Sequence, residues 1–357
     1  MPVIGFDVTK VSGQRHRSGL TRVSERLRGE LAAVPDVALR EVVWHARRRT
    51  WIGRDTGRPM VLRDGEWILT PELFSEEERP GFTAWLSGNG ARAAAIYHDA
   101  IPLRFPSITW PQSVARHPEY MQLLASFGRV LAVSEASARE LTGYWAWSGV
   151  TDGPPVQPIM LGADGHGAPR AASPSSARRH LHEVLMVGIV EPRKNQDAVL
   201  DAVAQLAAEG VRCSVRFVGR VNPHFGRATE KRIRNMARAG LDVVHEASLD
   251  DEGLRRHVAN ARFALVPSRA EGCGLPVLES LWAGLPVLAT ALPSIVESAR
   301  GGGCMLVAPD DAAALIAAMR VLLTNDQEIE RLANEACART LPRWSDTAHA
   351  VAQALAK

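Results

Sequence analysis

Residues 263–290, FALVPSRAEGCGLPVLESLWAGLPVLAT, decide the fold of this chain. The apolar runs at the two ends, FALVPS and PVLAT, have the length and composition of buried strands. The segment LPVLESLWAG between them predicts a helix, with Pro276 in its first turn, where proline is tolerated. A strand, a helix and a second strand in this order predict a parallel βαβ unit.

The same alternation extends toward the N-terminus. EVLMVGIV, CSVRFVG and LDVVHE are strand-like and alternate with helical patterns, and VIGFDVT and RVLAVSEASARELTGYW repeat the arrangement earlier, with Ser134 as a helix cap. ARAAAIYHDAIPL predicts a buried strand that ends at Tyr97 and leaves His98 at its tip. Regular alternation predicts an α/β protein with doubly wound parallel sheets. Residues 50–70 are an exception and predict a hairpin around Asp64-Gly65.

The length of 357 residues suits two domains. Residues 165–180 are rich in Pro, Gly, Ala and Ser, which predicts a linker. The expected domains are therefore an N-terminal Rossmann-like domain at residues 1–168 and a C-terminal one at residues 181–341. Residues 342–357 carry apolar side chains at helical spacing, and we expect one face of this helix to pack against another part of the chain.

Composition excludes several classes of protein. The net charge is +3 and both signs are spread over the chain, so neither half is built to follow nucleic acid. Four widely spaced cysteines and the lack of an apolar leader predict a reduced, cytoplasmic protein. No apolar run approaches the roughly 20 residues that span a bilayer, so membrane contact, at the inner face of the cell membrane, would be peripheral. Residues 47–58 hold a basic cluster, interpreted as a solvated loop with anionic lipid or an acidic acceptor as the alternative.

A glycine-rich turn separates two glutamates in the opening stretch. Glu271 precedes Gly272, Cys273 and Gly274, and Glu279 is expected in the first turn of the following helix. Glycines let the backbone bend and approach a ligand closely. Carboxylates accept hydrogen bonds in pairs, which suits the vicinal hydroxyls of a sugar or a ribose. The simpler interpretations are a solvated turn residue for Glu271 and a partner of the helix dipole for Glu279.

Two cations precede another predicted helix. In VGIVEPRKNQDAV, Arg193 and Lys194 stand directly before Asn195, a good N-cap residue. A helix N-terminus carries partial positive charge, so adjacent cations cost stability unless an anion joins them. The expected anion is a phosphate or pyrophosphate, and the alternative is that both side chains reach into solvent.

These motifs together resemble a known family. EGCGLPVLE is similar to the E-x7-E motif of retaining glycosyltransferase family 4, which has GT-B architecture, and VGIVEPRKN to that family's donor diphosphate loop. SGLTRV resembles its N-terminal glycine loop, YHDAIPL the histidine strand tip, VLAVSEASAREL the serine-bearing turn and RWSDTAHAVAQAL the closing helix. The resemblance implies two facing Rossmann-like domains with a cleft between them, the acceptor held mainly by the first and the nucleotide-sugar by the second. It also implies that the helix at residues 342–357 packs back on the first domain.

The resemblance also implies roles for individual residues. Glu271 would contact the hydroxyls of the transferred sugar and Glu279 the ribose. Arg193 and Lys194 would bind the diphosphate, His98 would lie near the reacting anomeric carbon, and Gly19 would let the first domain approach the donor phosphates. The implied catalytic residues are His98, Glu271, Arg193 and Lys194, and the implied donor-binding residues are Gly19, Arg193, Lys194, Gly272, Cys273, Gly274, Leu275 and Glu279.

Two features depart from the family pattern. Cys273 stands where an aromatic residue is usual, and LWAG replaces a more common Met-Ala segment. Both substitutions are expected to reshape the sugar pocket. We interpret Cys273 as a packing residue, because a retaining enzyme of this type needs no thiol nucleophile.

The implied reaction is retaining transfer of a hexosyl group from a nucleoside diphosphate sugar to a hydroxyl of a growing glycan or lipid-linked glycan. EPRKN and HDAIPL look most like bacterial mannosyl- or rhamnosyltransferases of surface polysaccharide or lipopolysaccharide synthesis, which makes GDP-mannose the first expected donor. No D-x-D pair is present, and LDDEG predicts the acidic start of a helix, so we expect transfer without a metal or other cofactor. The alternatives are a sugar-nucleotide epimerase and a silent nucleotide-binding scaffold of a polysaccharide assembly complex.

Overall fold

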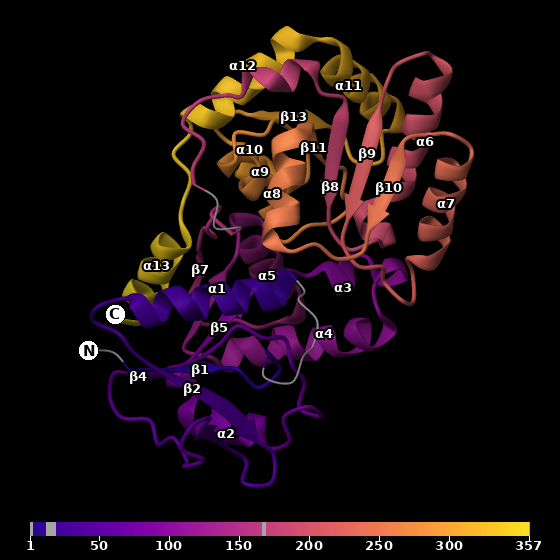
Figure 1. Cartoon of the computed structure of the whole chain (residues 1–357). Helices are drawn as coiled ribbons and strands as arrows, with labels where there is room; N and C mark the ends of the chain where they lie inside the picture. The colour runs from indigo at the N-terminus through magenta and orange to yellow at the C-terminus, as the bar shows by residue number, and fades with distance from the viewer. Residues whose placement is uncertain (1–2, 12–18, 166–168, 357) are drawn as a thin grey trace. The chain divides into compact units, whose positions relative to one another are not determined.

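The structure of the chain is a computed structural model that describes residues 3–11, 19–165 and 169–356 (Figure 1). The chain divides into two compact units. The first comprises Met1–Gly162 and Pro342–Lys357, and the second Ala163–Leu341. Each unit has its own sheet, so the prediction of an α/β chain with two parallel-sheet domains is confirmed.

The described residues of the first unit form a seven-stranded sheet in the order β3-β2-β1-β4-β5-β6-β7. Its strand pairs are parallel except β2 with β3. The strands are β1 Val3–Asp7, β2 Ala38–His45, β3 Thr50–Gly53, β4 Glu66–Thr70, β5 Ala93–Tyr97, β6 Arg129–Ala132 and β7 Val156–Pro158. The helices are α1 Gly19–Ala33, α2 Phe82–Asn89, α3 Ile101–Arg104, α4 Pro111–Leu123, α5 Glu135–Ser148 and α13 Trp344–Ala356. The strand β5, AAAIY, is buried throughout, as a central parallel strand must be.

The predicted hairpin around Asp64-Gly65 is wrong. Gly65 does turn with a positive φ of 79°, and β4 begins at the next residue. However, β4 pairs in parallel with β1 and β5, whereas β3 pairs with β2 in antiparallel orientation. The turn therefore reverses the chain without joining two paired strands.

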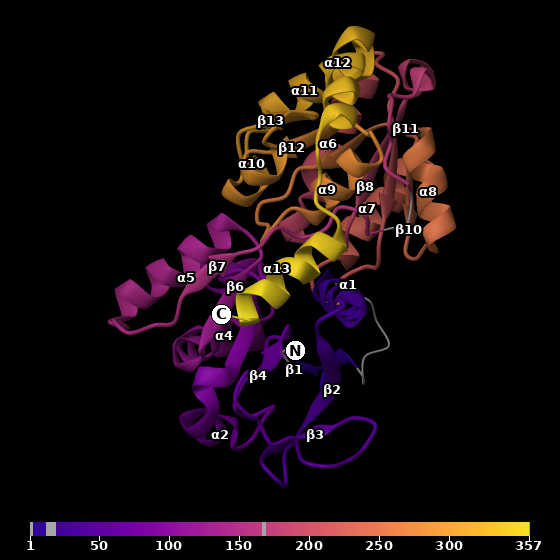
Figure 2. The same cartoon turned by 90° about the vertical axis from the view of Figure 1, so that its left-hand side faces the viewer.

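The helix α13 completes the first unit after the chain has passed through the second. It packs against α1, and Figures 1 and 2 both show the two helices side by side. Trp344, Val351 and Leu355 are buried along one face, as the apolar spacing predicts. The Thr347 hydroxyl donates to the Met160 carbonyl at 2.8 Å.

The second unit has a six-stranded sheet among its described residues, in the order β10-β9-β8-β11-β12-β13 and parallel throughout. Its two faces are covered by separate apolar clusters. The strands are β8 Glu183–Val187, β9 Ser214–Val218, β10 Val243–Glu246, β11 Ala261–Val266, β12 Val287–Thr290 and β13 Cys304–Val307. The helices are α6 Gln196–Ala208, α7 Arg227–Arg238, α8 Asp251–Asn260, α9 Leu275–Trp282, α10 Pro293–Ala299, α11 Ala312–Thr324 and α12 Asp326–Ala338.

The segment interpreted as a linker, residues 165–180, packs on the second unit where it is described. Arg170 donates from Nη1 to the carbonyls of Leu281 and Trp282 at 2.8 and 2.7 Å, and the Ala171 amide donates to Trp282. Proline and glycine content alone does not reveal such anchoring, because a single arginine supplies most of the bonds. Over the described part of the chain, no helix combines the length and apolar character needed to cross a membrane.

Candidate functional site

Two loops of the second unit follow neighbouring strands. The strands β8 and β11 pair in parallel, for example through Leu185 and Ala264, and the sheet order reverses between them. Ligands of doubly wound sheets bind outside the carboxyl ends of the strands at such a reversal. The loops that leave this edge, residues 188–195 and 267–274, are tied together by the Arg269 amide, which donates to the Arg193 carbonyl at 2.8 Å.

A buried ion pair joins the two loops. Lys194 Nζ donates to Glu271 Oε1, and the side chains are 10% and 8% exposed. The Ser268 hydroxyl donates to the same oxygen at 2.7 Å, and Arg193 Nη1 lies 3.4 Å from Glu271 Oε2. The structure therefore brings together the three residues to which the sequence assigned the donor sugar and diphosphate.

The charges of this group depend on one another. Burial raises the pKa of Glu271, but Lys194, Arg193 and the hydrogen bonds to the carboxylate lower it further, and the net pKa lies below the ordinary value. Burial lowers the pKa of Lys194, and Arg193 adds to this effect against the attraction of Glu271. Glu271 is accordingly a carboxylate over the neutral range, and two cations face it.

A second carboxylate holds Arg193 in place. Arg193 Nε donates to Glu191 Oε1 at 2.9 Å, and Arg193 Nη1 donates to the Ala270 carbonyl at 3.2 Å. Asn222 Nδ2 donates to the other oxygen of Glu191 at 3.0 Å. Sequence reasoning assigned no role to Glu191, Asn222 or Ser268. Glu191 stands inside the quoted EPRKN motif, whereas Asn222 follows a different strand and carried no local signal.

The cations lie before α6 as predicted, and two carboxylates of the chain lie beside them. A 3₁₀ turn, Pro192–Lys194, places both side chains directly before the helix. The carboxylates of Glu271 and Glu191 supply the compensating charge within the chain. Asn195 occupies the cap position in a left-handed conformation with φ of 61°, and its side chain makes no capping bond, contrary to its interpretation as an N-cap side chain.

The glycine-rich turn is fixed by hydroxyl groups of α10. Ser294 donates to the Glu271 carbonyl and Ser298 to the Cys273 carbonyl, each at 2.7 Å. Gly274 adopts φ of 71°, a left-handed conformation that glycine reaches without strain, and α9 begins at the next residue. Gly272 and Cys273 are half-buried in this turn, and Leu275 is buried as the first residue of α9.

Glu279 does not lie in the first turn of its helix. Because α9 begins at Leu275, Glu279 is one turn further along, where its side chain is buried. The prediction of Pro276 in the first turn is confirmed. Glu279 is therefore a buried residue of the second helical turn, and it does not partner the helix dipole from the first turn.

His98 and Gly19 belong to the first unit. The strand β5 ends at Tyr97 as predicted, and His98 follows it, buried, with Nε2 at 2.9 Å from the Pro71 carbonyl. Burial lowers the pKa of His98, so the ring is neutral at neutral pH. Ser137, whose amide is capped by Ser134 as predicted, donates its hydroxyl to the His98 carbonyl at 2.7 Å.

Gly19 is the first residue of α1. A methyl group built at Gly19 would meet no atom within 4 Å among the described residues, so the first unit by itself does not require glycine there. Its assignment to donor phosphates stays a prediction. The structure thus groups Arg193, Lys194 and Glu271 with the turn 272–275 in the second unit, and it holds His98 and Gly19 in the first.

These features define a class of protein, the α/β proteins with two doubly wound units and a polar site at the carboxyl edge of the second sheet. Anabaena HepE, solved in complex with UDP and glucose, shares this fold with a TM-score of 0.67 and 14% identity, covering 99% of each chain. The shared fold is that of the GT-B glycosyltransferases, as the sequence predicts.

The family follows from the sequence of the second unit. Residues 182–325 match the family model described as Glycosyl transferases group 1. Most of the second unit therefore matches a Glycosyl transferases group 1 domain, in agreement with the predicted enzyme class, a glycosyltransferase.

Two characterised relatives are mannosyltransferases by name. The serotype-specific mannosyltransferase WbdA of Escherichia coli is 28% identical over 253 residues, which are 68% of this chain and 30% of WbdA. The MMP alpha-(1->4)-mannosyltransferase of Mycolicibacterium hassiacum is 30% identical over 221 residues, which are 60% of this chain and 50% of that protein. The chain spans at most half the length of these two relatives.

Proposed function

We propose that the chain transfers a hexosyl group from a nucleoside diphosphate sugar to a hydroxyl of a growing glycan, with retention at the anomeric carbon. Mannose from GDP-mannose is the first donor to test, because WbdA and the mycobacterial relative are both named mannosyltransferases. A surface polysaccharide is the proposed product, since WbdA is described as serotype-specific.

The observation that carries this proposal is the buried group formed by Glu271, Lys194 and Arg193. Before the donor binds, Glu271 and Glu191 together supply the charge that compensates the two cations. A diphosphate at the edge of β8 and β11 would bind Lys194 and Arg193, and the remaining acceptor positions of Glu271 would accept hydrogen bonds from sugar hydroxyls. As the glycosidic bond breaks, negative charge grows on the leaving diphosphate, and fixed cations in a buried site stabilise it.

The remaining assignments are part of the same proposal. Glu279 binds the ribose, and the turn 272–275 presents its backbone to the donor. The first unit holds the acceptor, with His98 beside the reacting carbon. Lys194 and Arg193 act in place of a divalent metal.

The direct experiment is a screen of nucleotide release by the whole chain across GDP-, UDP- and dTDP-sugars, with and without glycan acceptors. Release that depends on an acceptor supports transfer. Conversion of the donor into an isomeric sugar nucleotide would favour an epimerase. Donor binding without any turnover would favour a silent scaffold.

Replacing Lys194 should remove most of the turnover. We expect Lys194→Ala to lower kcat by about 100- to 1000-fold, because loss of one fixed charge stabiliser costs that much in buried sites. Lys231→Ala, which changes an exposed lysine of the same unit, is the matched control and should keep wild-type kcat. Equal kcat in the two variants would contradict the role of Lys194.

A further inference from the structure

The sheet of the first unit has a reversal of its own. The chain proceeds from β1 outward to β2 and β3 and then returns to β4 on the other side of β1. The strands β1 and β4 pair in parallel, and they end at Asp7 and Thr70. Ligands of doubly wound sheets bind outside this kind of strand end, so the residues here are candidates for contact with a substrate.

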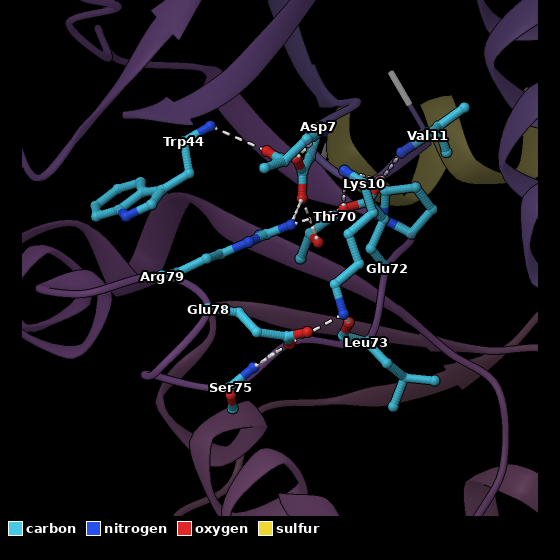
Figure 3. A network of polar contacts seen from close by, with 12 residues as sticks. Asp7, Lys10, Val11, Trp44, Thr70, Glu72, Leu73, Ser75, Glu78 and Arg79 are labelled. Carbon is cyan, nitrogen blue, oxygen red and sulfur yellow. Dashed lines mark hydrogen bonds and ion pairs between the residues drawn. The ribbon is translucent and has the colours of Figure 1, made fainter. Parts of the chain in front are cut away.

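A buried ionic network occupies this edge, as Figure 3 shows. Arg79 Nη2 lies 2.5 Å from Asp7 Oδ2 and 2.8 Å from Glu72 Oε2. The three side chains are 1%, 0% and 4% exposed. The Thr70 hydroxyl donates to Asp7 at 2.8 Å, and the Arg79 guanidinium stacks on the ring of Phe74 with 3.8 Å between Cζ and the ring centroid.

The two carboxylates of the network hold three consecutive backbone amides. The Thr9 amide donates to Asp7 Oδ1 at 3.0 Å. The Lys10 and Val11 amides donate to Glu72 Oε1 at 2.8 and 3.0 Å. The Thr9 hydroxyl also donates to Asp7 and accepts from the Trp44 amide. Residues 9–11, which begin the connection from β1 to α1, are thus bound to buried charges.

This arrangement is expensive for a purely structural anchor. The carboxylates of Asp7 and Glu72 share the single guanidinium of Arg79. The nearby Lys10 ammonium does not pair with them, because it contacts the Leu73 carbonyl and Glu78 instead. Each ion moved out of water costs several kcal/mol, on the order of the whole margin of stability, unless its partners compensate. In agreement, burial and the charge of Asp7 raise the pKa of Glu72 to about 7. A costly fixed geometry is characteristic of groups that support a reacting site.

We propose that Glu72 is a positioning residue for the transfer reaction: tied to Arg79, it fixes residues 9–11 at the sheet edge where the first unit presents the acceptor. The inference rests on the proposed function for the identity of the reaction. Its geometric part, the hold of Glu72 on the Lys10 and Val11 amides, stands on the contacts alone.

The experiment compares Glu72→Ala with Glu66→Ala in the full chain. Glu66 is a matched control, because it is a buried glutamate at the opposite end of β4 and its carboxylate accepts from the Arg63 amide at 2.8 Å. Two quantities are measured, the hydrogen exchange of amides 9–11 and the ratio of transfer to hydrolysis of the donor. The ratio does not depend on how much of the protein is folded, so a loss of stability alone leaves it unchanged.

We expect Glu72→Ala to speed exchange at Lys10 and Val11 at least tenfold and to lower the ratio of transfer to hydrolysis about tenfold. Glu72→Gln keeps an oxygen for the two amides but no charge for Arg79, and it should lie between Glu72→Ala and the wild type. Glu66→Ala should match the wild type in both measurements. Unchanged exchange at these amides, or faster exchange with an unchanged ratio, would overturn the proposal. Absence of turnover in the wild-type chain with every donor would instead contradict the proposed function. Hydrogen exchange needs no substrate, so it would still test the hold of Glu72 on the amides in that case.

Discussion

Glu271 has two tasks that normally conflict. As a counter-ion it must stay close to Lys194, and as a ligand for sugar hydroxyls it must leave lone pairs open. The geometry accommodates both, because Oε1 accepts from Lys194 and Ser268 while Oε2 makes a longer contact of 3.4 Å with Arg193. A carboxylate has about four acceptor positions, so hydroxyl groups can be bound without breaking the ion pair.

Neutralising Glu271 should destabilise the second unit. In Glu271→Gln the buried ammonium of Lys194 loses its charge partner, and breaking a buried pair typically costs about 3–5 kcal/mol. The double variant Lys194→Met/Glu271→Gln removes both charges and should recover a large part of this loss. Thermal denaturation of the wild type, the two single variants and the double variant measures the coupling. Additive losses would contradict a paired role.

The residues of this site were predictable from the sequence to the extent that they lie in continuous motifs. Arg193, Lys194 and Glu271 each stand in a strand, loop and helix pattern that puts them at a strand end. The partners Glu191 and Asn222 were not predicted, because their contact depends on β8 lying beside β9. The contacts of Glu271 with the two cations were not predicted either, because they too depend on which strands are neighbours in the sheet.

At the scale of elements, the sequence predicted strands and helices better than their partners. Apolar runs and cap residues locate β5 and the start of α5, and both agree with the structure. The hairpin at Asp64-Gly65 failed because a turn signal reports a local reversal, whereas pairing is decided by which strand completes the sheet. The start of α9 at Leu275 agrees with the predicted segment LPVLESLWAG, but Glu279 is its fifth residue and so lies beyond the first turn.

The contribution of α13 to the stability of the first unit can be tested by replacing Trp344. Trp344 is 2% exposed. The backbone of Gly162 approaches it so closely that a methyl group at Gly162 would lie 2.2 Å from the backbone nitrogen of Trp344. We expect Trp344→Ala to cost about 3–5 kcal/mol through the cavity it leaves. Trp147→Ala, at a tryptophan that is 82% exposed, is the control and should stay within about 0.5 kcal/mol of the wild type. Equal melting temperatures for the two variants would contradict the packing described for α13.

At the scale of the whole molecule, the free energy of unfolding should depend on pH through the titration of Glu72. Its pKa is about 7 against the ordinary value of 4.5, because burial and Asp7 raise it more than Arg79 and the Lys10 and Val11 amides lower it. A carboxyl group that binds its proton more tightly when folded contributes its full stability below the unfolded pKa and loses it as the pH rises through the folded pKa. Stability from Glu72 is therefore highest at acidic pH and lost toward pH 7.

The measurement is the melting temperature of the wild type and of Glu72→Gln between about pH 5 and pH 8, where this linkage acts. As the pH rises over this range, the free energy of unfolding of the wild type should fall by up to about 3 kcal/mol relative to that of the variant, since one pKa unit corresponds to about 1.4 kcal/mol. Glu66→Gln serves as the control and should keep the wild-type slope. A constant difference between wild type and Glu72→Gln across this range would refute the assignment.

The return of α13 to the first unit also means that the packing partners of this unit are synthesised at widely separated times. A ribosome makes α1 early, then the whole of residues 163–341, and only afterwards the helix α13 that packs against α1. At typical elongation rates of about 5–20 residues per second, that interval lasts on the order of ten to forty seconds. The second unit can finish folding within that interval, whereas the first unit lacks α13, one of its packing partners, until residues 344–356 have been made.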